Sequence, residues 1–205
     1  MHDLADADAA AIPAPGLADP VHDTQRLFRA ALDAMSRPGT VQPLPVPVAP
    51  PPPLVPWAGA LALTLIDGDT PVWLDRVLDR PAVRTWLRFH CGCPLVDDPG
   101  AAAFALIGDA ASLDDLTPFR LGPPEYPDRA ATLIVQVAGL GTGPDGHRLS
   151  GPGIRDHARL SAVGLADGFW PALADNAALY PDGVDVVLAA PDGLAALPRS
   201  VMVED

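Results

Sequence analysis

Two aspartates separated by one glycine, Asp67 and Asp69, are the clearest candidates for acid–base or nucleophilic chemistry in this sequence. They follow the apolar run 63–66 and precede Thr70 and Pro71. Such a pair could supply a nucleophile, a general acid/base and Mg²⁺ ligands, as in an aspartate-nucleophile phosphatase loop. The Asp-x-Asp-x-Thr order of that chemistry is broken, because Pro71 stands where the threonine is needed. We therefore predict a structural turn, in which Asp67, Asp69, Thr70 and Pro71 join a helix end to the next strand, and keep a free-standing Mg²⁺-dependent phosphohydrolase as the alternative.

A second group of reactive side chains, His90, Cys91 and Cys93, lies within four consecutive positions. A structural zinc site normally needs four ligands with at least two residues between paired cysteines, and Cys-Gly-Cys is too short for that. A disulfide across one residue would be strained. The spacing favours small buried thiols at the entry to a strand. Metal binding and redox chemistry stay open as alternatives.

Four arginines, at positions 76, 80, 84 and 88, recur every fourth residue. On one helix they would form a cationic ridge able to hold an anion or an acidic partner through bidentate pairing. The alternative is a solvated face on which Asp75 and Asp79 neutralise the first two arginines. Pro81 interrupts the helical spacing, so only Arg84 and Arg88 are expected to share a face.

Other patterns do not predict catalysis. Gly141–Gly146 has the Gly-x-Gly-x-x-Gly spacing of a dinucleotide site, but that site needs a helix next. Residues 147–153 contain three glycine or proline breaks, so a glycine-rich β-hairpin loop is expected instead. None of the five serines lies in Gly-x-Ser-x-Gly, and only two glutamates are present. We therefore predict no catalytic, cofactor-binding or metal-binding residues from the motifs alone.

Composition excludes several classes of protein. All thirteen basic residues are arginine, and the absence of lysine rules out a pyridoxal phosphate (PLP) Schiff base, so no cofactor is predicted. The net charge of −13 opposes binding to nucleic acid. No apolar run of about 18 residues predicts a membrane span, and the acidic start does not read as a signal peptide. Two cysteines do not make a disulfide framework, so a cytoplasmic location is expected.

The elements that must position these residues follow from periodicity and turn signals. Helices are predicted over 23–35 (with Asp23 or Thr24 as N-cap), from about 54 to 65, over 79–90 and over 169–179, and a small helix from Ser112. Strands are predicted over 72–74, 104–107, 132–137 and 184–188, with a hairpin through Pro191–Gly193 to 194–197. Eight prolines between positions 43 and 56 predict a stiff, extended loop. We expect residues 1–20 to be a disordered acidic tail and 21–205 to be one α/β domain with a mixed sheet and flanking helices.

Seven blocks of the sequence form a specific series when taken together and in order: residues 28–39, 63–74, 87–95, 131–137, 149–154, 181–188 and 197–200. This series resembles the PhnH family, the H subunit of the bacterial carbon–phosphorus lyase machinery. The resemblance covers about residues 22–204 and rests on the whole series of blocks. Positions that match the family pattern include Asp69, Thr70, Pro71, Trp73, Arg88, Phe89, His90 and Pro94. The departures are Cys91, where the family commonly has threonine, the proline-rich run and the acidic tail.

The resemblance implies a role in phosphonate catabolism. It implies a homodimer with a fold similar to the large domain of PLP-dependent transferases but without the cofactor, and the G, I and J subunits as partners. Together the subunits form α-D-ribose 1-methylphosphonate 5-triphosphate from ATP and methylphosphonate. Within that transferase, this chain is expected to be a non-catalytic scaffold. Arg84, Arg88 and His90 are then candidates for a partner or anion contact.

Overall fold

The computed structural model describes residues 13–123 and 125–204, which fold around a seven-stranded mixed sheet. Its strands are β1 (Gln42–Pro43), β2 (Val72–Leu74), β3 (Leu95–Val96), β4 (Phe104–Ile107), β5 (Thr132–Gln136), β9 (Asp185–Ala189) and β10 (Gly193–Leu197). Their order is β1-β10-β9-β5-β4-β2-β3. The run from β9 to β3 is parallel, whereas β10 is antiparallel to both of its neighbours. The chain is therefore an α/β protein with a mixed sheet, as the sequence predicts.

A smaller, antiparallel sheet has the order β11-β7-β8-β6. It consists of β6 (Gly139–Gly141), β7 (His147–Ser150), β8 (Ala158–Val163) and β11 (Met202–Val203). The helices are α1 (Pro20–Ser36), α2 (Pro56–Leu65), α3 (Pro81–Cys91) and α4 (Phe169–Ala178), and short 3₁₀ turns cover Pro99–Ala101, Ala110–Ser112 and Pro127–Arg129. Among the described residues, no helix is both long and apolar enough to cross a bilayer.

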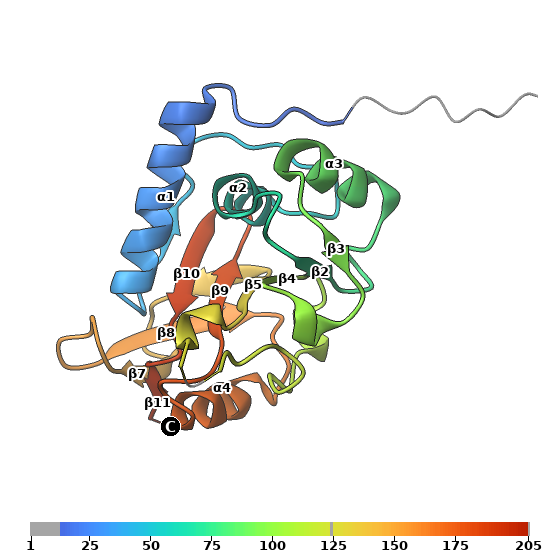
Figure 1. Cartoon of the computed structure of the whole chain (residues 1–205). Coiled ribbons are helices and arrows are strands. Elements are labelled where there is room, and N and C mark those ends of the chain that lie inside the picture. The colour runs from blue at the N-terminus through green and yellow to red at the C-terminus, as the bar shows by residue number, and fades with distance from the viewer. Residues whose placement is uncertain (1–12, 124, 205) are drawn as a thin grey trace, which may run out of the picture.

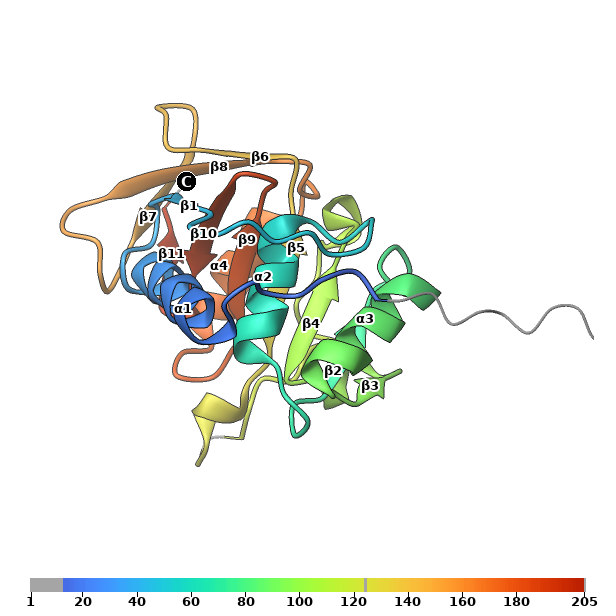
Figure 2. The same cartoon turned by 90° about the horizontal axis from the view of Figure 1, so that it is seen from above.

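Both faces of the large sheet are buried, and its strands alternate their side chains between two cores. Helices α1, α2 and α3 cover one face, while α4 and the small sheet cover the other (Figures 1 and 2). In β5, Ile134 joins the core beneath the three helices, whereas Leu133 and Val135 join the core beneath α4. This explains why the strands are almost continuous apolar runs, as parallel strands covered on both sides must be.

Strand prediction from apolar runs agrees closely with the structure. The predicted bounds of β2 and β4 are the observed ones, and Pro191–Gly193 does join two antiparallel strands. The predicted strand 132–137 ends one residue earlier, and the predicted strand 184–188 is shifted by one residue. The small helix predicted from Ser112 is wrong, since the 3₁₀ turn there ends at Ser112.

The first helix begins earlier than its apolar spacing indicates. Asp19, rather than Asp23 or Thr24, is the N-cap: its side chain accepts from the backbone N–H of His22, and Pro20 occupies the first turn. Asp23 reaches back and accepts from the backbone N–H of Asp19 at 2.9 Å. The two aspartates thus satisfy donors reciprocally, as in a capping box.

The proline-rich segment is extended and is anchored at its end by one side chain of the sheet. Gln136 in β5 accepts from the backbone N–H of Val55 at 2.7 Å and donates to the carbonyl of Pro53 at 3.1 Å. Val46, Val48 and Leu54 of this segment are buried against the helical core. The segment is thus a packed part of the helical layer, and only its first residue, Pro43, pairs in the sheet.

Candidate functional site

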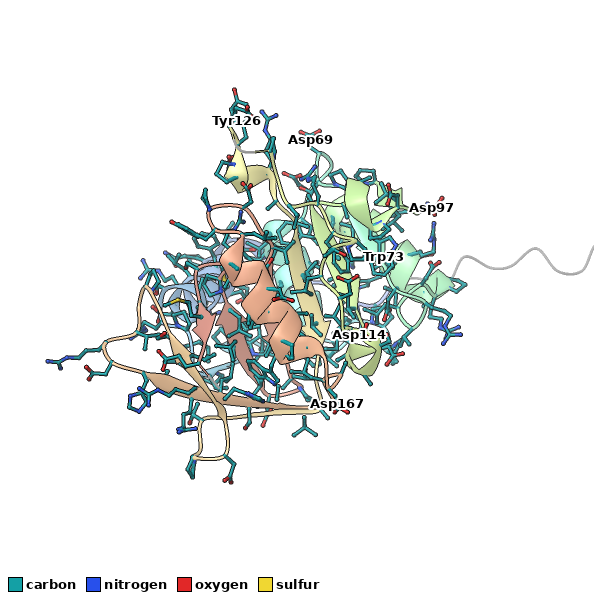
Figure 3. All side chains as sticks on the ribbon, turned by 90° about the horizontal axis from the view of Figure 1, so that it is seen from below. Asp69, Trp73, Asp97, Asp114, Tyr126 and Asp167 are labelled. Carbon is teal, nitrogen blue, oxygen red and sulfur yellow. The ribbon has the colours of Figure 1, made fainter. Side chains whose placement is uncertain are left out.

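The aspartate pair 67/69 lies in a turn between α2 and β2. One oxygen of Asp67 accepts from the backbone N–H of Asp69 at 3.1 Å and from the hydroxyl of Thr70 at 2.6 Å. The Thr70 hydroxyl and then the Asp69 N–H lower the pKa of Asp67, because both bonds favour the carboxylate. The turn precedes β2 and therefore lies at the amino ends of the parallel strands. Ligands of α/β sheets bind at the other edge, at the carboxyl ends of the strands. Figure 3 shows Asp69 at the amino edge, far from Asp167.

His90 contacts the chain's own N-terminal segment. Its Nε2 lies 2.9 Å from the carbonyl oxygen of Ala14, and the indole N–H of Trp86 donates to the same oxygen at 3.0 Å. Ala14 and Leu17 pack against the helical core. Residues 1–12 of the predicted tail lie outside the described residues. Residues 13–19 lie along the domain, which differs from the disorder expected for them.

The two thiols are buried at the end of α3 and lack the properties of nucleophiles. Burial raises the pKa of Cys91 to about 12, and burial also raises the pKa of Cys93. Cys91 lies 3.5 Å from the carbonyl of Ala62, to which its thiol can donate. Because the thiolate is the reactive form, burial disfavours reaction of both thiols near neutral pH. No group of three potential metal ligands occurs among the residues that the structure describes.

The four arginines do not form one helix face, as the position of Pro81 predicts. The helix starts at Pro81, so Arg76 and Arg80 precede it, and only Arg84 and Arg88 share it. Arg84 pairs with Asp79 at 2.7 Å. Asp75 does not neutralise an arginine: it is buried and accepts three backbone N–H bonds, each at 2.8 Å, from Leu78, Gly108 and Asp109. Arg88 is exposed on α3.

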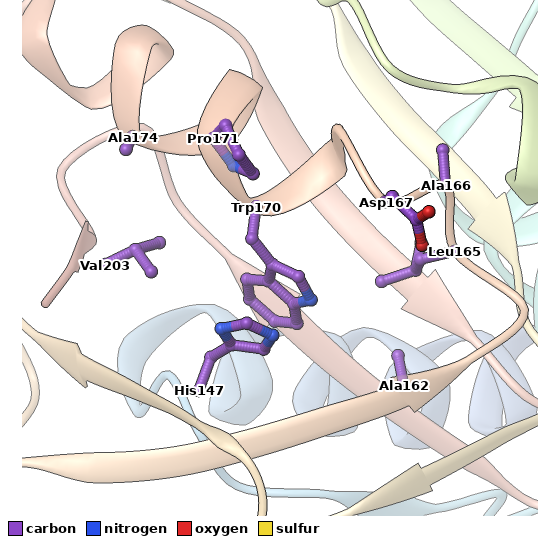
Figure 4. A pocket seen from close by; sticks show the side chains of 9 residues that line it. All are labelled: His147, Ala162, Leu165, Ala166, Asp167, Trp170, Pro171, Ala174 and Val203. Atoms are coloured by element: carbon purple, nitrogen blue, oxygen red, sulfur yellow. The ribbon is translucent and has the colours of Figure 1, made fainter. Parts of the chain in front are cut away.

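A hollow with a volume of about 560 Å³ lies where α4 meets the small sheet. Figure 4 shows that His147 from β7 and Trp170 from α4 form one wall. Their rings stack with centroids 4.3 Å apart and an interplanar angle of 26°. Asp167 is the acidic residue of the lining, and the rest is apolar: Ala162, Leu165, Ala166, Pro171, Ala174 and Val203.

A second hollow of about 420 Å³ lies along α4 and shares Pro171 with the first. Its apolar lining comes from Leu116, Leu121 and Leu179, among others. Its charged residues are all acidic: Asp114, Asp115 and Asp175. A third hollow of about 300 Å³, at the carboxyl ends of β2 and β4, also includes Asp114 and Asp115. The three hollows and their acidic residues therefore lie around α4 and the carboxyl edge of the sheet. Figure 3 shows Asp114 and Asp167 near one end of α4.

The loop at this edge is held by an aromatic contact and by a carboxylate. Trp73 and Phe119 pack edge to face with centroids 5.9 Å apart. Thr117 donates its backbone N–H and its hydroxyl to the two oxygens of Asp115, at 2.8 and 2.9 Å. These bonds lower the pKa of Asp115. The arrangement can bind and position a cationic or apolar partner, and it offers no paired nucleophile and base among the residues described.

Comparison with known proteins identifies the family. A model described as "Bacterial phosphonate metabolism protein (PhnH)" matches residues 15–204. The chain belongs to the PhnH family. A PhnH relative from Rhizobium meliloti (strain 1021), named alpha-D-ribose 1-methylphosphonate 5-triphosphate synthase subunit PhnH, is 40% identical over 91% of this chain and 93% of its own length. A putative C-P lyase subunit protein, HtxG, from Stutzerimonas stutzeri is 36% identical over 50% of this chain and 51% of its own length.

Sequence reasoning identified the family of this PhnH protein but missed the surface around α4. His147 and Trp170 are 23 positions apart and come together only because the small sheet packs on α4. The hairpin loop predicted for Gly141–Gly146 is not observed: the segment leads from β6 to β7, and these two strands pair with β8 rather than with each other. The one available signal was the adjacent pair Asp114-Asp115, which has no special spacing to another acid.

Proposed function

We propose that this chain is the H-type subunit of a bacterial carbon–phosphorus lyase machinery. In this role it supports formation of α-D-ribose 1-methylphosphonate 5-triphosphate from ATP and methylphosphonate. The observation that carries the proposal is the 40% identity, over nearly the full length of both chains, to the synthase subunit PhnH of Rhizobium meliloti. A subunit of this kind is expected to assemble with the G, I and J subunits in the cytoplasm.

The role within the complex is that of a scaffold without its own active site. Three features support this: the Asp67 carboxylate is engaged by its own turn, the thiols are buried, and His90 bonds a backbone carbonyl. A Mg²⁺-dependent phosphohydrolase would need Asp67 and Asp69 to face a substrate together. That alternative predicts phosphatase activity of the isolated protein that is lost in Asp67→Asn.

The scaffold is further proposed to share its fold with the large domain of PLP-dependent transferases, without the cofactor. The support is the mixed seven-stranded sheet with helices on both faces and one reversed strand, β10, next to its edge. The absence of lysine agrees, since the Schiff base needs a primary amine.

We place the homodimer interface on the outer face of α1. Val21, Phe28 and Leu32 lie on one helical stripe and are 76%, 47% and 55% exposed. Apolar side chains gathered on an outer helix face are typical of a self-complementary interface. Leu32→Glu is expected to convert the dimer into a monomer, as measured by light scattering. Phe89 on α3 is also apolar and is 68% exposed, so Phe89→Glu is the control and should leave the mass unchanged.

Growth on methylphosphonate tests the function directly. A bacterial strain that lacks its own H subunit is expected to grow on methylphosphonate as sole phosphorus source when it expresses this chain. Asp67→Asn and Cys91→Ala/Cys93→Ala should complement as well as the wild type, because the scaffold does not use these groups chemically. Failure of the wild-type chain to restore growth, with the G, I and J subunits supplied from the same source, would refute the proposal.

A further inference from the structure

Helix α4 presents an outer surface that is low, apolar and hollowed on both sides. Its exposed or half-exposed side chains are mostly small: Pro171, Ala172, Ala174, Ala177 and Ala178. The two large hollows flank this ridge and share Pro171. Leu179 and Tyr180, which follow the helix, are 45% and 64% exposed. We call the helix, both hollows and these two residues the α4 surface.

Four uncompensated negative charges surround the α4 surface. Asp114, Asp115, Asp167 and Asp175 are all exposed, and none forms an ion pair within residues 13–123 and 125–204. The only ionisable residue of the two linings that can become positive is His147. Five arginines elsewhere in the described chain pair with other acids: Arg26, Arg37, Arg84, Arg148 and Arg199. The α4 surface thus combines apolar hollows with a negative rim.

We infer that the α4 surface is the docking site for a segment of another subunit that carries arginine or lysine side chains beside apolar ones. The inference deepens the proposed function and rests on it, because it names the surface through which this subunit joins the complex. Apolar side chains of the segment fill the hollows beside Pro171 and Leu179. Its basic side chains pair with Asp114 and Asp175 on one side of α4 and with Asp167 on the other.

Shape and charge together select this occupant. Phosphate-bearing partners are repelled by four aspartates, which excludes nucleic acid and anionic lipid from this surface. A single metal ion would not use the apolar hollows, and a small ligand would not reach the hollows on both sides of α4, because a helix with its side chains is about 10–12 Å across. A polypeptide can do both, and small residues along the ridge let its backbone approach α4 closely. Opposite charges at the rim steer association and make it sensitive to salt.

Charge reversal with a matched control tests the inference. Asp114→Arg/Asp175→Arg replaces two exposed carboxylates that accept no side-chain or backbone hydrogen bond in the described part of the chain. Asp145→Arg/Asp192→Arg makes the same change in net charge at exposed loop positions that line neither hollow. Each protein is co-expressed with the G, I and J subunits, and the amount that co-purifies is measured at 50 and 300 mM NaCl. Circular dichroism and the mass of the isolated protein are measured in parallel.

The expected result is at least a tenfold loss of co-purification for Asp114→Arg/Asp175→Arg, with the control variant equal to wild type and wild-type binding weaker at 300 mM. Leu179→Ser should weaken co-purification at both salt concentrations and leave the effect of salt unchanged, because it removes an apolar contact and no charge. If the charge reversal impairs folding, Asp114→Asn/Asp175→Asn carries the test with a smaller loss. If Asp114→Arg/Asp175→Arg and Asp114→Asn/Asp175→Asn both co-purify at the wild-type level, the inference is overturned and the proposed function is left intact. A change only in the mass of the isolated protein also overturns it, because the surface would then bind a second copy. A wild-type protein that binds no subunit refutes the proposed function itself.

Discussion

Replacing Asp75 is expected to be among the most destabilising single changes in this protein. Its carboxylate lies at the carboxyl end of β2 and accepts three backbone N–H bonds at 2.8 Å, one from Leu78 and two from Gly108 and Asp109. Asp75→Ala removes the acceptor of all three donors at once. The bonds link the segment that leads into α3 with the loop that follows β4, so the change affects the hollow at the carboxyl ends of both strands.

The magnitude follows from the burial of the donors. An orphaned buried donor costs about 1–3 kcal/mol. Leu78 is fully buried, whereas Gly108 and Asp109 are half-buried, so water can partly replace the carboxylate at the latter two. We expect Asp75→Ala to lower the free energy of unfolding by about 3–5 kcal/mol, and Asp75→Asn to lower it by less, because one carbonyl oxygen remains as an acceptor.

Urea unfolding followed by circular dichroism measures this loss. Asp97→Ala is the matched control, since Asp97 is an exposed aspartate near the same edge with no hydrogen bond among the described residues, and its effect should stay within about 0.5 kcal/mol. A loss below about 1 kcal/mol for Asp75→Ala would show that these three bonds contribute little to stability. Asp75 would then not be what holds the segment after β2 to the loop after β4.

Three further predictions concern the other reactive side chains. Burial raises the pKa of the Cys91 thiol to about 12, so this thiol should not react with a maleimide at pH 8 in the native protein. It should react at once in 6 M guanidinium chloride. Prompt labelling of the native protein would contradict the burial of Cys91. His90→Ala should release residues 13–19 and speed proteolysis of this segment severalfold, whereas Phe89→Ala on the same helix should not. The folded state lowers the pKa of Asp67 below 3.8, so its stabilisation is present above that pH and is lost as pH falls through the lowered pKa. The difference in urea midpoint between wild type and Asp67→Ala should therefore shrink from pH 5 to pH 2, and a difference that grows with acid would refute this assignment.

Local sequence signals were sufficient for the elements that lie in the large sheet. Runs such as 104–107 and 132–136 are apolar on both faces, and a strand covered on both sides is the simplest structure they can form. Helix α1 begins earlier than its apolar periodicity predicts. Its start is set by the cap at Asp19, which exchanges hydrogen bonds with the first turn, and by Pro20, and neither signal is periodic.

The α4 surface could not be predicted in the same way. Its parts come from the loop after β4, from β7 and from α4, and no repeat or spacing connects them before the two sheets are packed. The patterns that did stand out, the 67/69 aspartates and the His-Cys-Gly-Cys run, are explained by a turn and by burial. Residue types capable of chemistry are thus a weak guide where packing assigns them structural roles.

The strand order of the large sheet also constrains how the chain can fold. The edge strand β1 pairs only with β10, so that Gln42 lies opposite Leu194, and β5 pairs with β9 through Thr132 and Asp185. Contacts between residues this far apart in sequence form late, because a long loop must close first. During synthesis, the apolar faces of α1 and the proline-rich segment therefore remain exposed until β9 and β10 have been made. Removal of β9 and β10 would leave that whole layer without its sheet, so we expect the chain to fold as one cooperative unit that is completed only near its C-terminus.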